Sequence, residues 1–577
     1  NSGTASPTLQ INASRSDLSE KLSHYSSISM DEYKEIALLY ADETRRKVNE
    51  LCSGLEAWQI IAYSVGVTLL LNWLYNFLCH PRLTIKQRIV QNFFKFVKSL
   101  PIIKDKIKAE IDKNVSDIAR DLFPLKPGDS YITELPAKGL TRENILNKVN
   151  KDYKPMGGID WKGGKVSGCV YAGTDELAAL AATMYEDFAW TNPLHPDVFP
   201  DVRKMEAEIV AMTLKMFNAS KSGCGTMTSG GTESILMALA SYRDLATERG
   251  IEYPEIIAPV SAHAAFDKAA HYFRMKLVHV PLDPVTQQAD VRAMRRKINK
   301  RTAVLVGSAP MFPFGVMDPI EKIAELGDYY NIPVHVDSCL GGFLVPFMEK
   351  AGFPLAPFDF RVKGVTSISA DTHKYGYAPK GSSVIMYSEK KFRHPQFFVS
   401  PDWTGGIYAT PTIGGSRAGA IIAACWATMM YFGEDGYVEN TRKIVSTTRK
   451  VAQEVGKIPG LFVYGNPEVS VVGVGSKVFN IYRLSGALTE RGWNLNSLQF
   501  PSSFHLCVTL RQTFPGVAEQ FIQDVKECTE EIMKTPNEKA SGSAALYGTA
   551  QAIPDRSLVT DMARGYLDAY YSTDPIE

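Results

Sequence analysis

Short apolar runs alternate with runs of helical period between residues 203 and 387, and this alternation restricts the fold more than any other feature of the 577-residue chain. Runs at 256–260, 303–306, 334–336 and 382–387 predict strands, and helices are predicted from about residue 203, after the glycine pair at 230–231 and over 320–330. Strands that alternate with helices favour a mostly parallel sheet covered by helices. Beyond about residue 431, strand-like runs at 460–465, 469–476, 478–484 and 503–510 predict a smaller α+β domain.

The segment 367–381, SISADTHKYGYAPKG, places polar side chains at the end of another predicted strand. Val365, Thr366 and Ile368 form its apolar, β-branched beginning. A site that excludes water disfavours the ammonium form of a lysine, so Lys374 can lose its proton there and attack a carbonyl group as a free amine. For a histidine–lysine pair on its own, a solvated loop lysine is the alternative interpretation.

Three other places supply matching chemistry. Asp337 follows the predicted strand 334–336, at the strand end where open α/β sheets bind ligands. The turn TMTSGGTES at 226–234 leads into a helix, so its backbone N–H groups suit a phosphate, although such a turn can equally be a simple helix cap. His263 follows the strand 256–260, where its ring can stack on a flat ligand or be a core residue.

The order of these features along the chain resembles that of fold-type I pyridoxal 5'-phosphate (PLP) enzymes. The resemblance implies that Lys374 forms the Schiff base, that Asp337 keeps the pyridine nitrogen protonated, and that His263 lies against the ring. The residues that it assigns to cofactor binding are Lys374, Asp337, His263, His373, Gly231 and Thr232.

A closer resemblance, to the sphingosine-1-phosphate lyase family, covers the chain from about residue 151 to its end. It rests on NPLHP (192–196), SGGTESILMA (229–238), SAHAAF (261–266), ADTHKYGYAPKGSS (370–383), DWTGGIY (402–408) and GSRAG (415–419). Ser338 and Ala418 depart from the family pattern, and neither removes a group that the chemistry needs. By this resemblance Gly415 and Ser416 reach the cofactor phosphate of a neighbouring subunit, which implies a homodimer with shared active sites.

The family resemblance also implies a grip on the phosphate of the substrate. A glycine-rich stretch at 157–173 delivers Tyr171, a proline-flanked loop presents Asn192 and His195, and Lys380 lies six residues after Lys374. A phosphate monoester carries about −1.5 to −2 charges at neutral pH, which a lysine with hydroxyl and imidazole donors satisfies.

Residues 58–78, WQIIAYSVGVTLLLNWLYNFL, contain no charged residue and approach the ~20 residues that an α-helix needs to cross a bilayer. A buried globular helix is the alternative. Three basic residues at 45–47 precede this run and have acidic neighbours. The basic residues that follow it have no acidic neighbour before Asp105. Because basic residues are in excess on the cytosolic side of a span, the part after it is expected to face the cytosol. The following bases are Arg82, Lys86, Arg88, Lys95 and Lys98.

The expected organisation is therefore a lumenal tail at 1–55 with a sequon at Asn12, a transmembrane helix at 56–80, and a basic juxtamembrane segment at 81–150. Part of that segment, 82–122, either lies on an anionic membrane surface or packs on the enzyme or a partner subunit. An α/β PLP-binding large domain of fold type I follows at 151–430, and a smaller α+β domain at 431–577. The resemblance implies a single-pass protein of the endoplasmic reticulum membrane with its catalytic domain in the cytosol.

The composition excludes some other partners. The chain has 63 basic and 62 acidic residues, so its net charge is close to zero, and nucleic acid is not expected as its main partner. The eight cysteines are scattered without a CxxC pair, so neither a metal site nor a disulfide framework is predicted.

The resemblance implies an aldehyde-lyase that uses PLP to cleave phosphorylated long-chain sphingoid bases, by a retro-aldol reaction, into a long-chain aldehyde and phosphoethanolamine. The base that takes the hydroxyl proton stays open between Lys374, a histidine and a phosphate oxygen. One alternative function is a PLP-dependent amino-acid decarboxylase, which would release CO2 and would leave Tyr171, His195 and Lys380 without a joint purpose. The other is a non-catalytic membrane scaffold that keeps the enzyme fold, although such relatives usually lose the Schiff-base lysine or the ring acid, and both are present here.

Overall fold

The computed structural model describes residues 30–78, 85–122, 130–538 and 556–573. The sequon at Asn12 and the last two positions of the predicted span lie outside the described residues. By its internal contacts the chain divides into a unit of residues 1–89 and a unit of residues 90–577.

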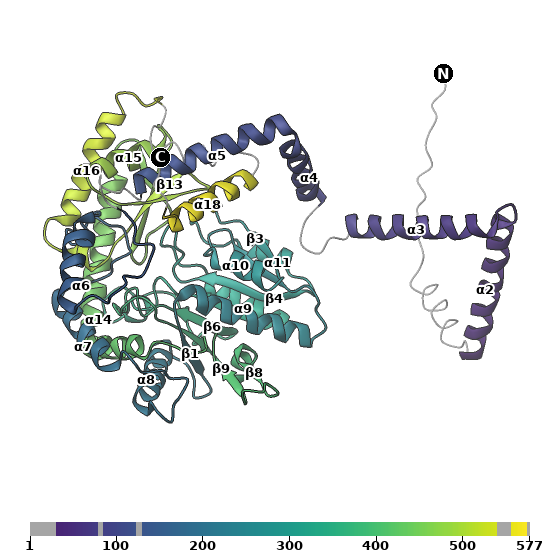
Figure 1. Cartoon of the computed structure of the whole chain (residues 1–577), viewed down its shortest axis with the longest axis horizontal. Helices are drawn as coiled ribbons and strands as arrows, with labels where there is room; N and C mark the ends of the chain where they lie inside the picture. The colour runs from purple at the N-terminus through teal and green to yellow at the C-terminus, as the bar shows by residue number, and fades with distance from the viewer. Residues whose placement is uncertain (1–29, 79–84, 123–129, 539–555, 574–577) are drawn as a thin grey trace, which may run out of the picture. The chain divides into compact units, whose positions relative to one another are not determined.

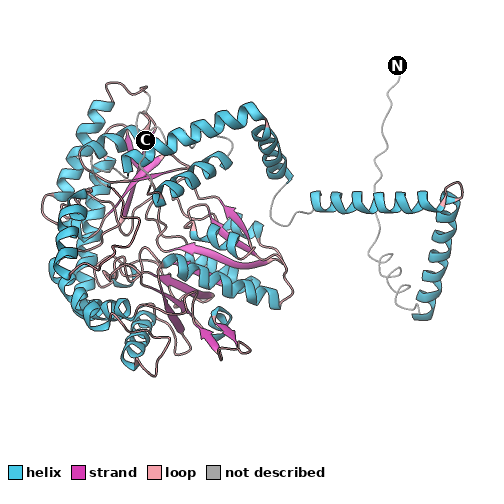
Figure 2. Ribbon diagram, in the orientation of Figure 1, coloured by secondary structure: helices cyan, strands magenta, loops and turns pink. Residues whose placement is uncertain are grey.

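A seven-stranded sheet forms the centre of the larger unit (Figures 1 and 2). Its strands lie in the order β1-β7-β6-β5-β4-β2-β3. All neighbours from β6 to β3 pair in parallel, and β7 is antiparallel to both β1 and β6. The predicted mostly parallel sheet is confirmed, whereas β1 and β3 were not among the predicted strands. The strands are β1 Cys224–Thr228, β2 Glu255–Pro259, β3 Lys276–Val280, β4 Thr302–Ser308, β5 Val334–Asp337, β6 Val365–Ala370 and β7 Ser383–Tyr387.

Helices cover both faces of this sheet, as the alternation along β7 shows. Val384 and Met386 belong to one hydrophobic cluster, with Ile209 of α8 (Pro200–Met216) and Ile320 of α12 (Ile320–Tyr330). Ile385 and Tyr387 belong to another cluster, with residues of α9 (Gly231–Glu248). Because apolar side chains fill most of both faces, ligand binding is expected at the strand ends.

A second sheet of four antiparallel strands has the order β10-β11-β13-β12 and confirms the α+β character predicted for the C-terminal part. Its strands are β10 Leu461–Val463, β11 Val471–Ser476, β12 Asn496–Leu498 and β13 Ser503–Cys507, with the helices α15 Ile481–Glu490 and α16 Val517–Ile532.

The strand predicted at 478–484 is wrong, because most of it belongs to α15. The side chain of Asn480 accepts a hydrogen bond from the backbone N–H of Tyr482 (3.1 Å) and caps the helix. Ile481, Leu484 and Leu488 then recur at helical spacing and are all buried. The capping residue, read as part of a strand in the sequence, marks the start of a helix.

The long helix α14 (Gly419–Gly456) contacts α7 (Asp175–Phe188), α8 and the second sheet. Gly433 interrupts its helical geometry with φ 56° and ψ −174°. The domain division expected at 430–431 falls inside α14, close to this glycine, and stays a prediction.

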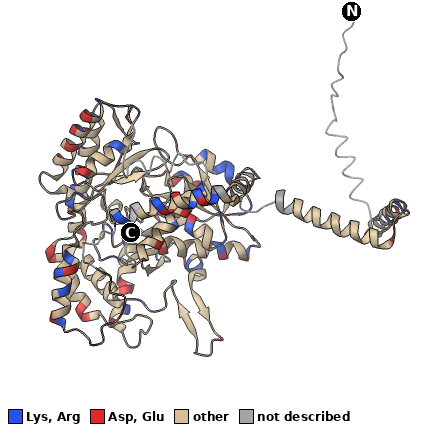
Figure 3. Cartoon of the chain, turned by 45° about the horizontal axis from the view of Figure 1, so that its top comes forward, with Lys and Arg blue, Asp and Glu red and all other residues tan. Residues whose placement is uncertain are grey.

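The smaller unit contains α2 (Met30–Cys52) and α3 (Ala57–Leu78). Ala57–Leu74 is long and apolar enough to cross a membrane, and none of it is buried inside the structure. In Figure 3 the ribbon of α3 carries neither the blue nor the red that marks charged residues. This exposure argues against a buried globular helix and is compatible with a single-pass anchor.

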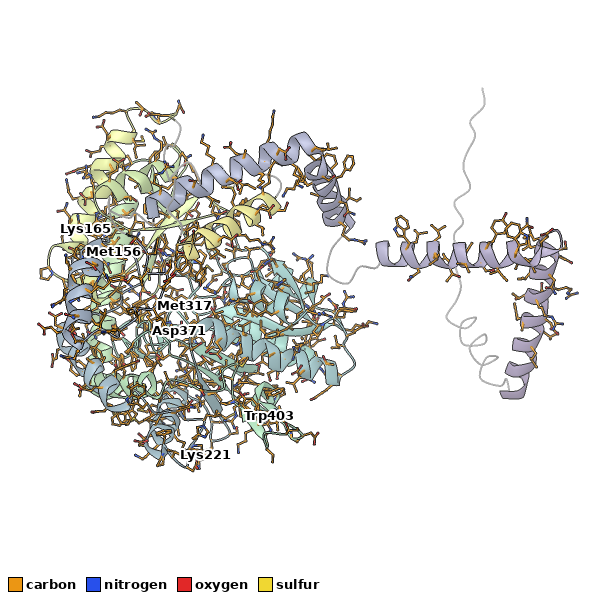
Figure 4. The ribbon with its side chains drawn as sticks, viewed as in Figure 1. Met156, Lys165, Lys221, Met317, Asp371 and Trp403 are labelled. Atoms are coloured by element: carbon orange, nitrogen blue, oxygen red, sulfur yellow. The ribbon has the colours of Figure 1, made fainter. Side chains whose placement is uncertain are left out.

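Of the remaining elements, α4 begins in the smaller unit, and the others belong to the larger unit. Helix α18 packs along α5 (Figure 1). A two-stranded hairpin, β8 with β9, carries Trp403 in its loop (Figure 4). The bounds are α4 Ile85–Ser99, α5 Pro101–Leu122, α6 Arg142–Lys148, α10 Ala265–Tyr272, α11 Val291–Lys297, α13 Lys390–Arg393, β8 Phe398–Ser400, β9 Tyr408–Thr410 and α18 Arg556–Tyr571.

Candidate active site

The turn after β6 brings Lys374 onto a buried carboxylate. Lys374 Nζ lies 2.9 Å from Asp371 Oδ2, and His373 Nε2 lies 3.6 Å from the same oxygen. Asp371 is 2% exposed and lies inside the larger unit (Figure 4). Among the described residues its other oxygen, Oδ1, has no hydrogen-bond partner. A carboxylate so placed orients Lys374 and keeps acceptor capacity for a further donor.

This pairing reverses the protonation expected for Lys374 from sequence. Burial lowers the pKa of Lys374, as expected, but the Asp371 carboxylate opposes it, and the net pKa is raised above its ordinary value. The expectation of a free amine produced by burial alone is wrong for this structure. The Asp371 carboxylate therefore favours the ammonium form of Lys374.

Asp337 lies at the end of the neighbouring strand. In the parallel pairing of β5 with β6 it is opposite Ser369, and its Oδ1 accepts hydrogen bonds from Cys339 N (3.0 Å) and Ser369 Oγ (3.4 Å). Two residues earlier, burial lowers the pKa of His335 to about 4. Asp337 is therefore a buried acid at the carboxyl end of its strand, next to a neutral imidazole.

The glycine turn at the start of α9 lies directly against this cluster. A Cβ built on Gly231 would lie 2.8 Å from both carboxylate oxygens of Asp371 and 2.7 Å from Cys339 Sγ. Only glycine fits such a close approach. No side chain caps the first turn of α9, so its backbone N–H groups are available to an anion.

Glu233 joins the glycine turn to the loop at 411–418. Its Oε2 accepts hydrogen bonds from the N–H (2.7 Å) and hydroxyl (2.6 Å) of Ser229, and its Oε1 accepts one from Ile413 N (3.2 Å). The two loops expected to bind phosphate are therefore connected within one chain.

Asn192 anchors the NPLHP loop to the GSRAG loop. Its amide nitrogen donates to Ser416 Oγ (3.0 Å), and its carbonyl oxygen accepts from Arg417 N (3.2 Å). Arg417 forms an ion pair with Glu206. A Cβ on Gly415 would lie 2.5 Å from the hydroxyl of Tyr408. Asn192, predicted to contact substrate phosphate, is already engaged with protein groups and positions these loops.

A cavity of about 610 Å³ lies between the glycine turn and the GSRAG loop. Its lining includes Ser229, Thr232, Gly381, Ser416 and Arg417, but neither Lys374 nor Asp337. Thr232 and Ser416 of the same chain thus meet at one cavity. The expected reach of Gly415 and Ser416 into a neighbouring subunit stays a prediction.

Two residues of the predicted phosphate grip lie together. Lys380 Nζ is 4.8 Å from the ring centre of Tyr171, and it donates to the backbone oxygen of His373 (3.4 Å). Tyr171 is buried edge-on against Tyr375. Desolvation lowers the pKa of Lys380, and the Lys374 ammonium acts in the same direction. This pair therefore lies next to Lys374 at the entrance to the buried cluster.

The structure does not connect the two remaining histidines to this cluster. His263 is exposed at the start of α10, where its Nδ1 accepts a hydrogen bond from Ala265 N (3.1 Å). His195 is exposed on its loop, and within the described ranges its side chain forms no hydrogen bond or ion pair. Both retain the freedom to bind a ligand.

Sequence reasoning quoted Asp371 but gave it no role. Its signal was its position three residues before Lys374 in a turn, a spacing that lets the two side chains meet. Cys339 and Glu233 carried no comparable signal, because the bond of the Cys339 thiol to Ser369 and that of Glu233 to Ile413 join segments far apart in the sequence. Within the described residues, no group of three or more His, Cys, Asp or Glu side chains could hold a metal ion.

The family model described as "Pyridoxal-dependent decarboxylase conserved domain" matches residues 133–475. Mouse sphingosine-1-phosphate lyase 1 is 52% identical over 545 residues, which are 94% of this chain and 95% of that protein. The chain belongs to the sphingosine-1-phosphate lyase family. The corresponding lyase of Saccharomyces cerevisiae is 46% identical over 84% of this chain and 83% of its own.

Solved structures agree with this assignment. The sphingosine-1-phosphate lyase of Burkholderia pseudomallei superposes with a TM-score of 0.70 at 38% identity, covering 78% of this chain and all of that one. The glutamate decarboxylase of Lactobacillus brevis reaches a TM-score of 0.61 at 21% identity and shows the fold alone. The decarboxylase name of the domain describes the fold that these enzymes share, and PLP is the cofactor of the family.

Proposed function

We propose that the protein is a membrane-anchored sphingosine-1-phosphate lyase, which cleaves phosphorylated long-chain bases into a long-chain aldehyde and phosphoethanolamine. The observation that carries this proposal is the 52% identity to the mouse lyase over nearly the whole of both chains. The buried cluster around Lys374 supplies the chemistry that such a reaction needs.

The residues of this cluster fit PLP. Lys374 would hold the cofactor covalently, Asp337 would face its ring nitrogen, and the N–H groups at Gly231 and Thr232 would receive its phosphate. The uncapped first turn of α9 and the unpartnered Oδ1 of Asp371 show that donors and acceptors remain at this place. When bound, PLP supplies a sink for the electrons of the carbon–carbon bond that breaks.

Asp371 controls the proton of Lys374. Its carboxylate lies at hydrogen-bond distance from Nζ, so it holds the amine in place and favours its ammonium form, the proton of which must leave before Lys374 acts as a nucleophile. His373, 3.6 Å from the same carboxylate, can share that charge. This arrangement makes Asp371 the positioning residue for Lys374.

The substrate phosphate would bind at the entrance to the cluster. Tyr171 and Lys380 already lie together there, and His195 lies on the loop that Asn192 anchors. An ammonium with hydroxyl and imidazole donors matches a phosphate dianion better than the carboxylate of an amino acid.

We also propose a single-pass topology in the endoplasmic reticulum membrane, with a lumenal N-terminus, a cytosolic catalytic part and a homodimeric assembly. Support for the span comes from the uncharged helix α3 and the bases that follow it. Support for assembly comes from the hairpin β8–β9, which exposes Phe398, Trp403 and Ile407, an apolar surface of the kind that subunit interfaces bury.

A product assay tests the proposed function. Purified protein in detergent, supplied with PLP and a phosphorylated sphingoid base, should release long-chain aldehyde and phosphoethanolamine, and the unphosphorylated base should give neither. Release of CO2 from an amino acid would leave the fold assignment intact and overturn the substrate.

A further inference from the structure

Helix α4 (Ile85–Ser99) carries exposed aromatic and aliphatic side chains. Ile89, Phe93 and Phe96 are 54%, 60% and 64% exposed. Side chains of this size on a soluble domain are normally covered when they occur together on one helix face. Something outside the described chain is therefore expected to cover this face.

The contacts of α4 show that its apolar face is directed away from the enzyme. Lys98 Nζ binds Asp561 (3.1 Å) and Ser557 (2.6 Å) of α18. At 3.6 residues per turn, Ile89 lies about 180° from Lys98 around the helix, and Phe96 and Phe93 lie about 160° and 140° from it. The polar edge at Lys98 packs on the enzyme, which reverses the orientation of an ordinary surface helix.

Charge and length indicate what covers the exposed face. All four charged residues of α4 are basic, and 15 residues span only about 22 Å as a helix, too short to cross a bilayer. Six residues separate α3 from α4, so the chain between the two helices reaches at most about 25 Å. A basic helix with an aromatic face, tethered this closely to a candidate span, matches the chemistry of an anionic bilayer surface.

We propose that α4 is a second membrane contact, lying in the plane of the bilayer surface with Ile89, Phe93 and Phe96 inserted at the boundary between headgroups and acyl chains. An anionic phospholipid leaflet is the partner. If the proposed lyase function is correct, this contact holds the catalytic unit next to the surface in which the long chain of the substrate is dissolved. The contact itself does not depend on that function.

Lipid quenching of the full chain tests the contact without any turnover. A fluorescent amino acid is placed at Phe96 in one protein and, as control, at Tyr329, a 77% exposed aromatic of α12. Both proteins are reconstituted into phosphatidylcholine vesicles with or without phosphatidylserine, containing lipids with a quencher near the headgroup. Quenching at position 96 should exceed that at position 329 by at least about threefold and increase with phosphatidylserine.

Equal quenching at the two positions would overturn the proposal, because α3 retains both proteins in the same vesicles. The proposal would also be overturned if position 96 shows no lipid quenching and is buried in a dimer or by another protein. That result would assign the exposed face of α4 to a protein partner.

Paired aromatic-to-aspartate variants provide the second arm. With the fluorescent amino acid at Ile89, the double variant Phe93→Asp/Phe96→Asp should lose at least about half of the lipid quenching, whereas Tyr329→Asp should lose none. If lyase turnover is observed, the double variant should also turn over vesicle-bound substrate several-fold more slowly and a water-soluble short-chain phosphorylated substrate at the normal rate. Retained quenching in the double variant would contradict the contact.

Discussion

The candidate site has a buried half and an outer half, which differ in how many contacts their side chains form within one chain. In the buried half, the charged groups of Lys374, Asp371 and Asp337 each lie within about 3 Å of a protein partner. In the outer half, His195 and His263 are exposed, and within the described residues neither imidazole contacts the buried cluster. The chain therefore preorganises the cofactor half, whereas the described residues leave the imidazoles of His195 and His263 exposed to solvent.

Desolvation explains this division. A buried charge without a partner is strongly unfavourable, so the sequence has to supply Asp371 for Lys374 and backbone or hydroxyl donors for Asp337. An exposed imidazole is solvated and needs no such partner. Preorganisation is costly to remove, so substitutions in the buried half should have the larger effects.

The largest effect is expected for Lys374→Ala. Loss of the amine that pairs with Asp371 should reduce turnover by more than about 10³-fold and abolish covalent capture of PLP. Absorbance after gel filtration and the product assay measure both quantities. Retained turnover would show that the buried half does not carry the chemistry.

Asp371→Asn should have the next largest effect. Loss of the charge-assisted contact is expected to reduce turnover by about 10- to 100-fold. Because the Asp371 carboxylate raises the pKa of Lys374 against the effect of burial, its removal should lower that pKa, and cofactor capture should begin at a lower pH.

The measurement is the rate of PLP capture by cofactor-stripped protein as a function of pH. Asp359→Asn is the matched control, because Asp359 is also buried and paired, with Arg361, and its loss should leave the pH profile in place. An unchanged profile in Asp371→Asn would mean that Asp371 does not govern the lysine proton.

The buried half was also the half that sequence could predict. β5 contains Val334 and Val336, and β6 contains Val365, Thr366 and Ile368, so Asp337 and Lys374 could be placed at strand ends from these β-branched residues. β1 could not, because the run CGTMT has little apolar character and owes its burial to its antiparallel pairing with β7. α15 was missed because Ile481 and Leu484 fit a strand as well as a helix until the cap at Asn480 is recognised.

The sequence predicts which residues belong to the site better than it predicts how they interact with one another. The bond from Asn192 to Ser416 joins positions 224 residues apart, and no local pattern reports such a pairing. The raised pKa of Lys374 depends on the direction of the Asp371 side chain, which a turn sequence does not specify. Residue types at strand ends are thus readable from sequence, whereas their pairing and protonation require the fold.

A smaller effect is expected at the boundary between the halves, for Lys380→Ala. Removal of one cationic donor from the entrance should raise KM for the phosphorylated substrate by about tenfold, with PLP capture unchanged. Steady-state kinetics with separate cofactor titration measure the two. Lys391→Ala, which removes another lysine placed over an aromatic ring, is the control and should change neither. A parallel loss of PLP affinity in Lys380→Ala would place Lys380 in the cofactor half.

Substitution of His335 is expected to have the smallest effect at neutral pH. It tests the comparison between the buried half and the outer half through the pH dependence of stability. Burial lowers the pKa of this histidine to about 4, below the ~6.5 of an unfolded chain, so the unfolded state binds more protons between these values. Its contribution to stability is therefore complete above about pH 6.5 and is lost as the pH falls towards 4, by about 3 kcal/mol in total. His335→Gln should flatten the fall of the thermal unfolding midpoint over this range, whereas His195→Gln, at an exposed position, should follow the unmodified protein. If both variants flatten the curve equally, burial is not what distinguishes the two halves of the site.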